Sequence, residues 1–198
     1  PRNAQALQFF GSLCYALGEW ERAVKHIAQA LEIIGPHPGL FSNLGLAWHK
    51  LQRYDRAVVC FAQAIKLAPD FVDARYNLAR SYVAAGQPEQ AFNLLRAVLE
   101  KNPKDHEALC EMGKALVAAE RHREALPYWQ KAILINPDYA PAYNGLGNSL
   151  RMLGLYEEAK RSLQFAVQLD PSLMSKVESS LGILQQSWGD YDRAEKHY

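Results

Sequence analysis

The sequence predicts an all-α solenoid assembled from repeated pairs of antiparallel helices, on the strength of three series of residues that share one period of 34. The first series is alanine at Ala23, Ala57, Ala91, Ala125 and Ala159. The second is proline at Pro69, Pro103, Pro137 and Pro171, and the third is a small residue at Gly45, Ala79, Gly113 and Gly147. A fixed period of this length is typical of stacked supersecondary units and not of one globular core.

The chain is predicted to form a single array, with repeats at 4–37, 38–71, 72–105, 106–139 and 140–173 and a partial repeat at 174–198. The second repeat shows the pattern best. Its first apolar stretch is Phe41, Leu44, Gly45 and Trp48, and its second is Ala57, Phe61, Ala64 and Ile65. Steps of three and four place each stretch on one face of a helix. Each repeat is therefore predicted to be a helical hairpin.

Glycine marks the break between the two helices of several repeats, at Gly18, Gly86, Gly154 and Gly189. A glycine there adopts the left-handed conformation that ends a helix. Gln52 and Glu120 stand in its place in two repeats, so those turns are expected to be less ideal. Between repeats, Pro69-Asp70 and Pro137-Asp138 end one helix and offer an aspartate near the start of the next.

Packing explains the small and large residues at fixed repeat positions. Gly45 and Gly113 are expected to let the first helix of a repeat approach a neighbour closely. Large side chains such as Phe61 and Trp129 then fill the remaining space. We therefore interpret the aromatic residues at these positions as core.

Three irregularities interrupt the period. Gly35-Pro36 replaces the single proline after the first repeat, which predicts a bent exit. Pro127 lies inside the second helix of the fourth repeat, close enough to its start to limit the cost. After Pro171 the register slips by one residue, and the sixth repeat stops within its second helix, so we expect the native chain to continue.

Composition excludes several functional classes. A formal net charge of +1 predicts no general attraction to nucleic acid, and no apolar run is long enough to insert into a membrane. Cys14, Cys60 and Cys110 are too few and too far apart for a disulfide framework or a zinc site. Reduced, packed cysteines favour a cytoplasmic location.

No motif for catalysis is readable in the sequence. It contains no glycine-rich phosphate loop, no HExxH and no GxSxG, and its histidines are scattered. The segment is therefore predicted not to be an enzyme and to need neither a cofactor nor a metal.

The repeat pattern resembles the tetratricopeptide repeat. A full match runs through Phe41, Leu44, Gly45, Trp48, Ala57, Phe61, Ala64 and Pro69, and a nearly full match through Tyr143, Leu146, Gly147, Leu150, Ala159, Leu163, Ala166 and Pro171. The resemblance implies a right-handed superhelix whose first helices line a concave groove. It also implies a protein-interaction scaffold that binds a peptide or partner segment in that groove.

The same resemblance identifies candidate groove residues, which are Asn43, His49, Lys50, Asp73, Tyr76, Asn77, Arg80, Glu107, Lys114, Asn144, Asn148 and Arg151. Tyr76, Arg80 and Lys114 are expected to be central contacts. Lys50, Arg80, Lys114 and Arg151 place one cation in each of four repeats, which favours an acidic, extended peptide or a terminal carboxylate. The alternative is a solvated face that binds nothing in particular.

Two specialised versions of the family fit only in part. Repeats that clamp the acidic tails of heat-shock chaperones need lysine and asparagine where this chain has Gln8 and Ser12, although Asn43 fits. The repeat arm of O-linked N-acetylglucosamine transferases carries a row of asparagines that bind a peptide backbone. Here Asn43, Asn77 and Asn148 occupy such places, and Glu111 and Gly145 interrupt the row.

Two alternative functions stay open beside the scaffold. The chain is a candidate for the substrate-recruiting arm of a larger enzyme, such as a glycosyltransferase. It is also a candidate for self-association into a homo-oligomer, because Leu181, Ile183, Leu184 and Tyr191 lack a capping helix.

Overall fold

The computed structural model describes residues 3–175, 177–180 and 182. By its internal contacts the chain divides into two compact units, Pro1–Leu94 and Leu95–Tyr198. The boundary falls within helix α6 (Pro88–Lys101). We describe each unit by itself.

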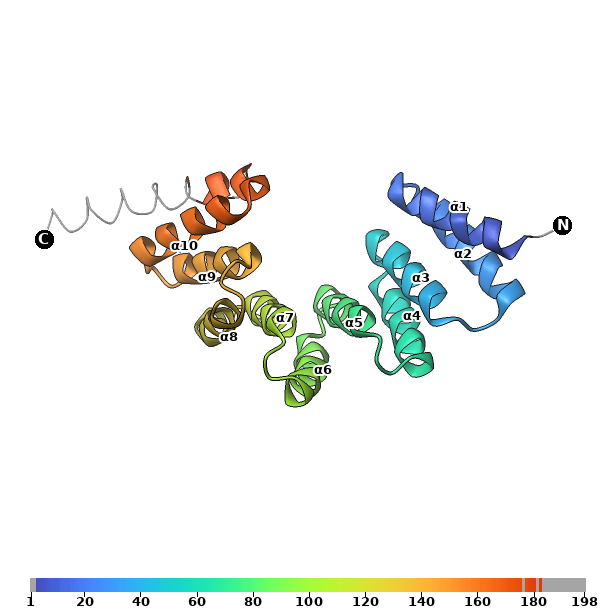
Figure 1. Cartoon of the computed structure of the whole chain (residues 1–198), viewed down its shortest axis with the longest axis horizontal. Helices are drawn as coiled ribbons and strands as arrows, with labels where there is room; N and C mark the ends of the chain where they lie inside the picture. Colours follow the sequence, from blue (N-terminus) through green and yellow to red (C-terminus); the bar gives the residue numbers. More distant parts are fainter. Residues whose placement is uncertain (1–2, 176, 181, 183–198) are drawn as a thin grey trace, which may run out of the picture. The chain divides into compact units, whose positions relative to one another are not determined.

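Unit 1 contains α1 (Ala4–Ala16), α2 (Trp20–Ile34), α3 (Pro38–Lys50), α4 (Tyr54–Leu67), α5 (Val72–Ala84) and the start of α6. Each helix folds back along the one before it (Figure 1). Within a repeat, α1 packs on α2 and α3 on α4. Between repeats, α2 packs on α3 and α4 on α5, so the same two types of contact alternate along the unit.

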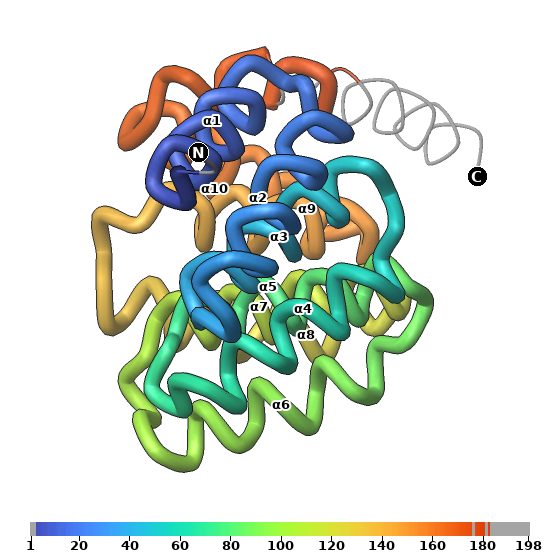
Figure 2. Tube along the Cα trace, turned by 90° about the vertical axis from the view of Figure 1, so that its right-hand side faces the viewer, coloured from blue at the N-terminus to red at the C-terminus, as the bar shows by residue number. Residues whose placement is uncertain are grey.

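Unit 2 contains the end of α6, then α7 (His106–Ala118), α8 (His122–Ile135), α9 (Ala140–Met152), α10 (Tyr156–Leu169) and a short 3-10 helix, η1 (Pro171–Leu173). Helix α7 packs on α8, α8 on α9, and α9 on α10. Figure 2 labels these four helices along the Cα trace, whose colour changes toward orange at α10.

The predicted all-α class of antiparallel helix pairs is confirmed, and the described residues include no strand. Helices α3, α5, α7 and α9 begin at Pro38, Val72, His106 and Ala140, the residues at which the sequence starts its repeats. The right-handed superhelical course of the whole array stays a prediction.

The turn inside each described repeat has one backbone geometry whether or not glycine is present. Gly18, Gly86 and Gly154 have φ angles of 77°, 73° and 78°. Gln52 and Glu120 have φ angles of 58° and 59°, in the left-handed region that a side chain disfavours. The two non-glycine turns therefore keep the repeat geometry at a local energetic cost, as the sequence predicted. Gly189 lies outside the described residues.

Helix capping differs from expectation at two repeat junctions. The caps of α5 and α9 are Phe71 and Tyr139, and neither makes a side-chain capping bond. Asp70 and Asp138 stand one residue too early to cap these helices. Asp105 does cap α7, because its carboxylate accepts a hydrogen bond from the backbone N–H of Ala108 at 3.0 Å.

The close approach predicted for the small residues is confirmed. A Cβ added to Gly45 would lie 2.9 Å from the ring of Phe61, and one added to Gly113 would lie 2.6 Å from the indole of Trp129. Both rings are almost completely buried. The eighth position of a repeat is therefore small because a large side chain of the paired helix occupies the space beside it.

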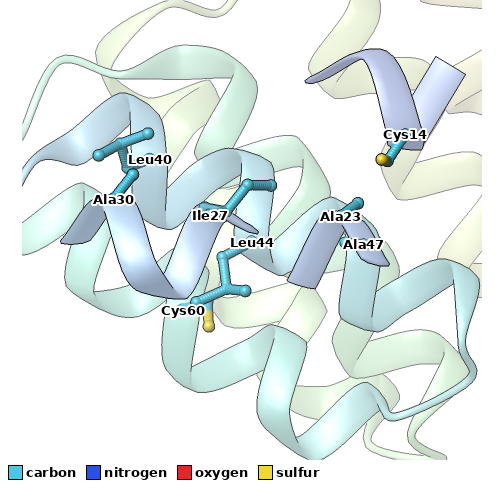
Figure 3. Close-up of a cluster of buried hydrophobic side chains, with 8 residues drawn as sticks. All are labelled: Cys14, Ala23, Ile27, Ala30, Leu40, Leu44, Ala47 and Cys60. Carbon is cyan, nitrogen blue, oxygen red and sulfur yellow. The ribbon is translucent and has the colours of Figure 1, made fainter. Parts of the chain in front are cut away.

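The core of unit 1 continues from one repeat to the next. Figure 3 shows a cluster formed by Cys14, Ala23, Ile27, Ala30, Leu40, Leu44, Ala47 and Cys60. These residues come from α1, α2, α3 and α4, so two consecutive repeats share one buried cluster. Unit 2 has a comparable cluster of Leu150, Ala159, Leu163 and Val177.

The three sequence irregularities have local consequences. After α2, Gly35 takes a φ of 87°, and α3 starts only at Pro38. Pro127 lies inside α8, which continues to Ile135. After α10 the chain enters η1 at Pro171, and Asp170 accepts a hydrogen bond from the Ser172 N–H at 3.0 Å.

Candidate functional site

The first helices of consecutive repeats contact one another within each unit. Helix α3 contacts both α1 and α5 in unit 1, and α7 contacts α9 in unit 2. Each unit therefore has a row of neighbouring first helices, and we call the surface of this row the first-helix face. All of the candidate residues chosen from the sequence lie on these helices.

A cavity of about 300 Å³ opens in the first-helix face of unit 1. Its lining comes from α1, α3 and α5, with one residue of α4 beneath them. The lining residues are Tyr15, Leu46, His49, Lys50, Phe61, Asn77 and Arg80. Four of them, His49, Lys50, Asn77 and Arg80, are candidate residues from the sequence, so the structure brings these four together.

A chain of hydrogen bonds holds the imidazole of His49 at this cavity. The Ser81 hydroxyl donates to the carbonyl oxygen of Asn77 at 2.8 Å, and the Ser81 Oγ lies 3.0 Å from Nδ1 of His49. Because the single hydroxyl proton is used by Asn77, Nδ1 of His49 must be the donor to Ser81. In neutral His49 the other ring nitrogen, Nε2, therefore carries the lone pair.

The surroundings of His49 disfavour its charged form. Burial lowers the pKa of His49 below its ordinary value of 6.5, and the positive charges of Lys50 and Arg80 lower it further. Tyr54 packs edge-on against the imidazole with ring centroids 5.1 Å apart. At neutral pH the cavity thus combines two fixed cations with a neutral histidine.

The remaining unit 1 candidates lie outside the cavity lining. Asn43 is half-buried and Asp73 is exposed. Tyr76, expected to be a central contact, is only 4% exposed and offers a ligand little surface. We leave Tyr76 out of the contact set proposed below.

In unit 2 one cation of the predicted row, Lys114, is paired within the protein. Nζ of Lys114 lies 2.8 Å from Oε1 of Glu111, and the Glu111 side chain is 5% exposed. Asn77 and Arg80 occupy the same two repeat positions in unit 1, where Nη1 of Arg80 donates to Oδ1 of Asn77 at 3.3 Å. A carboxylate therefore stands at this repeat position in unit 2, and an amide stands at it in unit 1.

The asparagines of unit 2 are also engaged within the protein. Nδ2 of Asn148 donates to the backbone oxygen of Asn144 at 2.9 Å, and Oδ1 of Asn148 accepts from Ser180 at 3.0 Å. Nε of Arg151 is buried and has no hydrogen-bond partner in the described part of the chain. Glu107 is exposed. Asn148 thus stabilises the junction between the fifth and sixth repeats.

Phe61 and Ser81 act at the unit 1 cavity although the sequence did not single them out for binding. Phe61 was assigned to the core, and it does form the floor of the cavity while being 0% exposed. Ser81 fixes the orientation of His49 from the next repeat. Its only sequence signal is a polar residue at a position that is alanine in the repeats on either side, Ala47 and Ala115.

A second cavity of about 470 Å³ lies at the turn between α3 and α4 in unit 1. Its lining includes Arg53, Asp55 and Arg56, so charges of both signs face it. The guanidinium of Arg56 lies 4.5 Å from the ring centroid of Trp48. The stacking on Trp48 gives the Arg56 side chain a structural role, so its position at this cavity does not indicate a ligand.

Other chemical features of the described residues are structural. Cys14, Cys60 and Cys110 are buried free thiols. Burial raises the pKa of Cys60 to about 11 and that of Cys110 to about 12. Across the part of the chain that the structure describes, no cluster of metal-ligating side chains occurs, and no helix has the length and apolarity needed to cross a membrane.

Solved structures share this fold. TTC0263, a TPR protein of Thermus thermophilus, is 20% identical over 90% of this chain and 99% of its own, with a TM-score of 0.74. A MamA fragment from Desulfovibrio magneticus RS-1 is 23% identical over 87% of this chain and 97% of its own, with a TM-score of 0.69. YrrB, a TPR protein with an unusual peptide-binding site, is 24% identical over 90% of this chain and 92% of its own, with a TM-score of 0.60.

Sequence comparison agrees with the fold. Curated protein sequences give no match. Profiles of the tetratricopeptide repeat match residues 6–36, 49–111 and 110–172, which together cover more than half of the chain. With the helix pairs and the shared structural fold, these matches show that the chain belongs to the tetratricopeptide repeat family.

Proposed function

We propose that this chain is a protein-interaction scaffold whose first-helix face in unit 1 binds a segment of a partner protein. The observation that carries the proposal is the cavity lined by three successive first helices, α1, α3 and α5. Its lining includes the exposed residues Lys50 and Arg80. A face with a central hollow and a polar border is suited to an extended peptide.

The comparisons support the same class of function. YrrB is named for a peptide-binding site, and a repeat fold without catalytic motifs is typical of interaction modules. The positive charges of Lys50 and Arg80 favour a partner segment that is acidic.

Peptide selection tests the proposal. Peptides selected from a random displayed library against the full chain are expected to lose binding when Lys50 and Arg80 are replaced by alanine. Truncating two contacts at one site costs about 1–2 kcal/mol each, so the dissociation constant measured by fluorescence anisotropy should rise about 30- to 1000-fold.

A matched control changes a second helix of unit 1, outside the cavity lining. Lys66→Ala changes an exposed lysine at the end of α4, a second helix, and is expected to leave binding unchanged. Equal binding by the wild type and by the double variant would contradict the proposal. Thermal melting of each variant separates lost contacts from lost folding.

Two alternatives from the sequence stay proposals. The resemblance to the repeat arm of O-linked N-acetylglucosamine transferases rested on a row of asparagines, and Asn148 already forms hydrogen bonds with Asn144 and Ser180. Self-association rested on Leu181, Ile183, Leu184 and Tyr191, which lie outside the described residues. Among the described residues of either unit, no contact favours the enzyme-arm alternative or self-association over peptide binding.

A further inference from the structure

We propose that one side of α1 is an interface between two copies of this chain, which pair through this helix about a two-fold axis. The surface consists of Phe9, Phe10, Leu13 and Leu17, and we call it the α1 apolar face. It is separate from the cavity of the proposed function and from the sixth-repeat residues considered above. Three observations carry the inference: the exposure of these side chains, their departure from the repeat pattern and the absence of charge on α1.

The α1 apolar face presents four large side chains to solvent. Phe9 and Leu17 are each 66% exposed, and Phe10 and Leu13 are exposed as well. Their spacing places all four within an arc of about 100° on one side of the helix. The rings of Phe9 and Phe10 meet edge to face with centroids 6.2 Å apart, and together the two rings leave about 200 Å² uncovered. A contiguous apolar surface of this kind marks an interaction site.

The repeat pattern does not account for two of these residues. Leu13 occupies a position that is small and buried in the next four repeats, as Ala47, Ser81, Ala115 and Ser149. Oγ of Ser149 accepts a hydrogen bond at 3.1 Å from Nε1 of Trp129, which belongs to the second helix of the preceding repeat. A helix packed on α1 as α2 packs on α3 would therefore meet a leucine where α3 presents an alanine.

Phe9 departs from the pattern in the same direction. Its position holds a polar residue or glycine in the next four repeats, as Asn43, Asn77, Glu111 and Gly145. On α1 the two departures add apolar bulk that stays exposed within the chain. The face is thus adapted to a neighbour other than the second helix of a regular repeat.

Charge does not oppose the approach of a second copy. Helix α1 has no charged residue between Ala4 and Ala16. Glu19, the first charged residue after α1, lies 2.5 Å from Arg22, with which it forms an ion pair. The formal net charge of the chain is only +1, so two copies repel each other weakly. Two α1 apolar faces can therefore meet without placing like charges together.

The α1 apolar face is also complementary to itself. Phe9 lies four residues before Leu13 and Leu17 lies four residues after it. In an antiparallel pair with the two-fold axis at Leu13, Phe9 of one copy therefore faces Leu17 of the other. The antiparallel arrangement also sets the N-terminus of each helix beside the C-terminus of the other, where their dipoles attract. This self-matching favours a second copy as the occupant over an unrelated partner.

Pairing through this face leaves the cavity of unit 1 accessible. Tyr15 is the residue of α1 that lines the cavity. Two residues along a helix correspond to a rotation of about 200°, so Tyr15 lies on the opposite side of α1 from Leu13. A dimer would therefore offer two peptide-binding cavities and would favour a partner that carries two binding segments.

Sedimentation velocity of the full chain tests the pairing. An interface made by one helix from each copy lies at the small end of the known range, below about 1,200 Å², so we expect a dissociation constant of about 10–100 μM. A concentration series from about 5 to about 500 μM should show a change from monomer to dimer. Raising sodium chloride from about 0.1 to about 1 M should not weaken the dimer, because the interface is apolar.

A charge at the axis should separate the copies. Leu13→Glu places two carboxylates opposite each other in an apolar interface, and the dissociation constant should rise more than about tenfold. The matched control is Leu134→Glu, which changes an exposed leucine of α8 in unit 2 and should leave the dimer unchanged. Circular dichroism of both variants checks that the helices are retained.

A second variant tests the axis without adding charge. Leu13→Cys places the two new thiols beside each other, because paired helix axes lie about 8–10 Å apart. Bismaleimidoethane, which carries two thiol-reactive groups on a short spacer, should then join the two copies covalently. The natural cysteines Cys14, Cys60 and Cys110 are buried and should react far more slowly. Leu134→Cys is the control and should give little covalent dimer.

The outcomes separate this inference from the proposed function. A wild-type chain that stays monomeric over the whole series overturns the inference. So does a dimer that Leu13→Glu leaves equally strong, or equal cross-linking of the two cysteine variants. Peptides selected from the library should bind Leu13→Glu with the same affinity per chain as the wild type. The peptide-binding scaffold therefore stands or fails by the Lys50 and Arg80 variants alone.

Discussion

At the scale of single residues, the left-handed turns show how strongly the repeat geometry is enforced. Gln52 and Glu120 adopt nearly the same φ angle as Gly18, Gly86 and Gly154. The packing of the flanking helices therefore determines this conformation, and the residue type only sets its local cost. A Cβ at Gly86 would meet no atom within 4 Å, so the cost is confined to the backbone.

A reciprocal pair of substitutions measures that cost. Gln52→Gly is expected to raise the free energy of unfolding by about 0.5–1 kcal/mol, because glycine adopts positive φ without steric conflict. Gly86→Gln is expected to lower it by a similar amount. Urea denaturation followed by circular dichroism gives both values, and an unchanged midpoint for each variant would contradict a backbone origin.

At the scale of helices, α1 and α3 differ in how far the same repeat position is buried. Phe10 and Leu44 occupy the same repeat position on α1 and α3. Leu44 is 9% exposed and shares a buried cluster with Ile27 of α2, whereas Phe10 is 50% exposed. The face that α3 buries against α2 is thus partly exposed on α1 in the described structure.

These two positions are expected to respond differently to truncation. Leu44→Ala should cost about 2–5 kcal/mol of unfolding free energy, as is typical of a buried leucine. Phe10→Ala removes a larger side chain but should cost less than about 1 kcal/mol, because half of it already contacts solvent. Chemical denaturation of both variants compares the two losses, and a larger loss for Phe10→Ala would show that α1 is covered in solution.

At the scale of the whole molecule, stability in a repeat array is built from local terms and contacts between neighbours. Cys60 in unit 1 and Cys110 in unit 2 are buried thiols whose pKa values are raised to about 11 and about 12. A thiol reacts as its thiolate, so both should resist alkylation at pH 8 while their surroundings are folded. Each cysteine thus reports on the folding of its own unit.

Leu44→Ala tests whether destabilisation spreads. Iodoacetamide labelling across a denaturant series, read by peptide mass spectrometry, should show Cys60 becoming reactive at a lower denaturant concentration in the variant than in the wild type. The corresponding shift for Cys110 should be smaller, because Leu44 and Cys60 share a cluster that Cys110 does not join. Identical shifts for the two thiols would mean that the whole chain unfolds as one cooperative body.

The sequence by itself determined the helix pairs, because the 34-residue period assigns one packing role to each repeated position. Gly45 against Phe61 and Gly113 against Trp129 follow directly from that period. The period also indicated which helices carry the candidate binding residues. Helix caps were harder to predict from the sequence. Asp70 and Asp138 each follow a proline, as a capping aspartate could, but each lies one residue before the N-cap position and makes no capping hydrogen bond to its helix.

Only the tertiary structure decided which candidate residues act together. Tyr76 is buried, Lys114 is paired with Glu111 and Asn148 holds Ser180, although all three stand at positions that the repeat pattern directs toward the binding face. His49, Lys50, Asn77 and Arg80 meet at one cavity because α3 and α5 lie side by side. The period specifies the direction of a side chain from its own helix, whereas burial, pairing and charge depend on neighbours that come from other repeats.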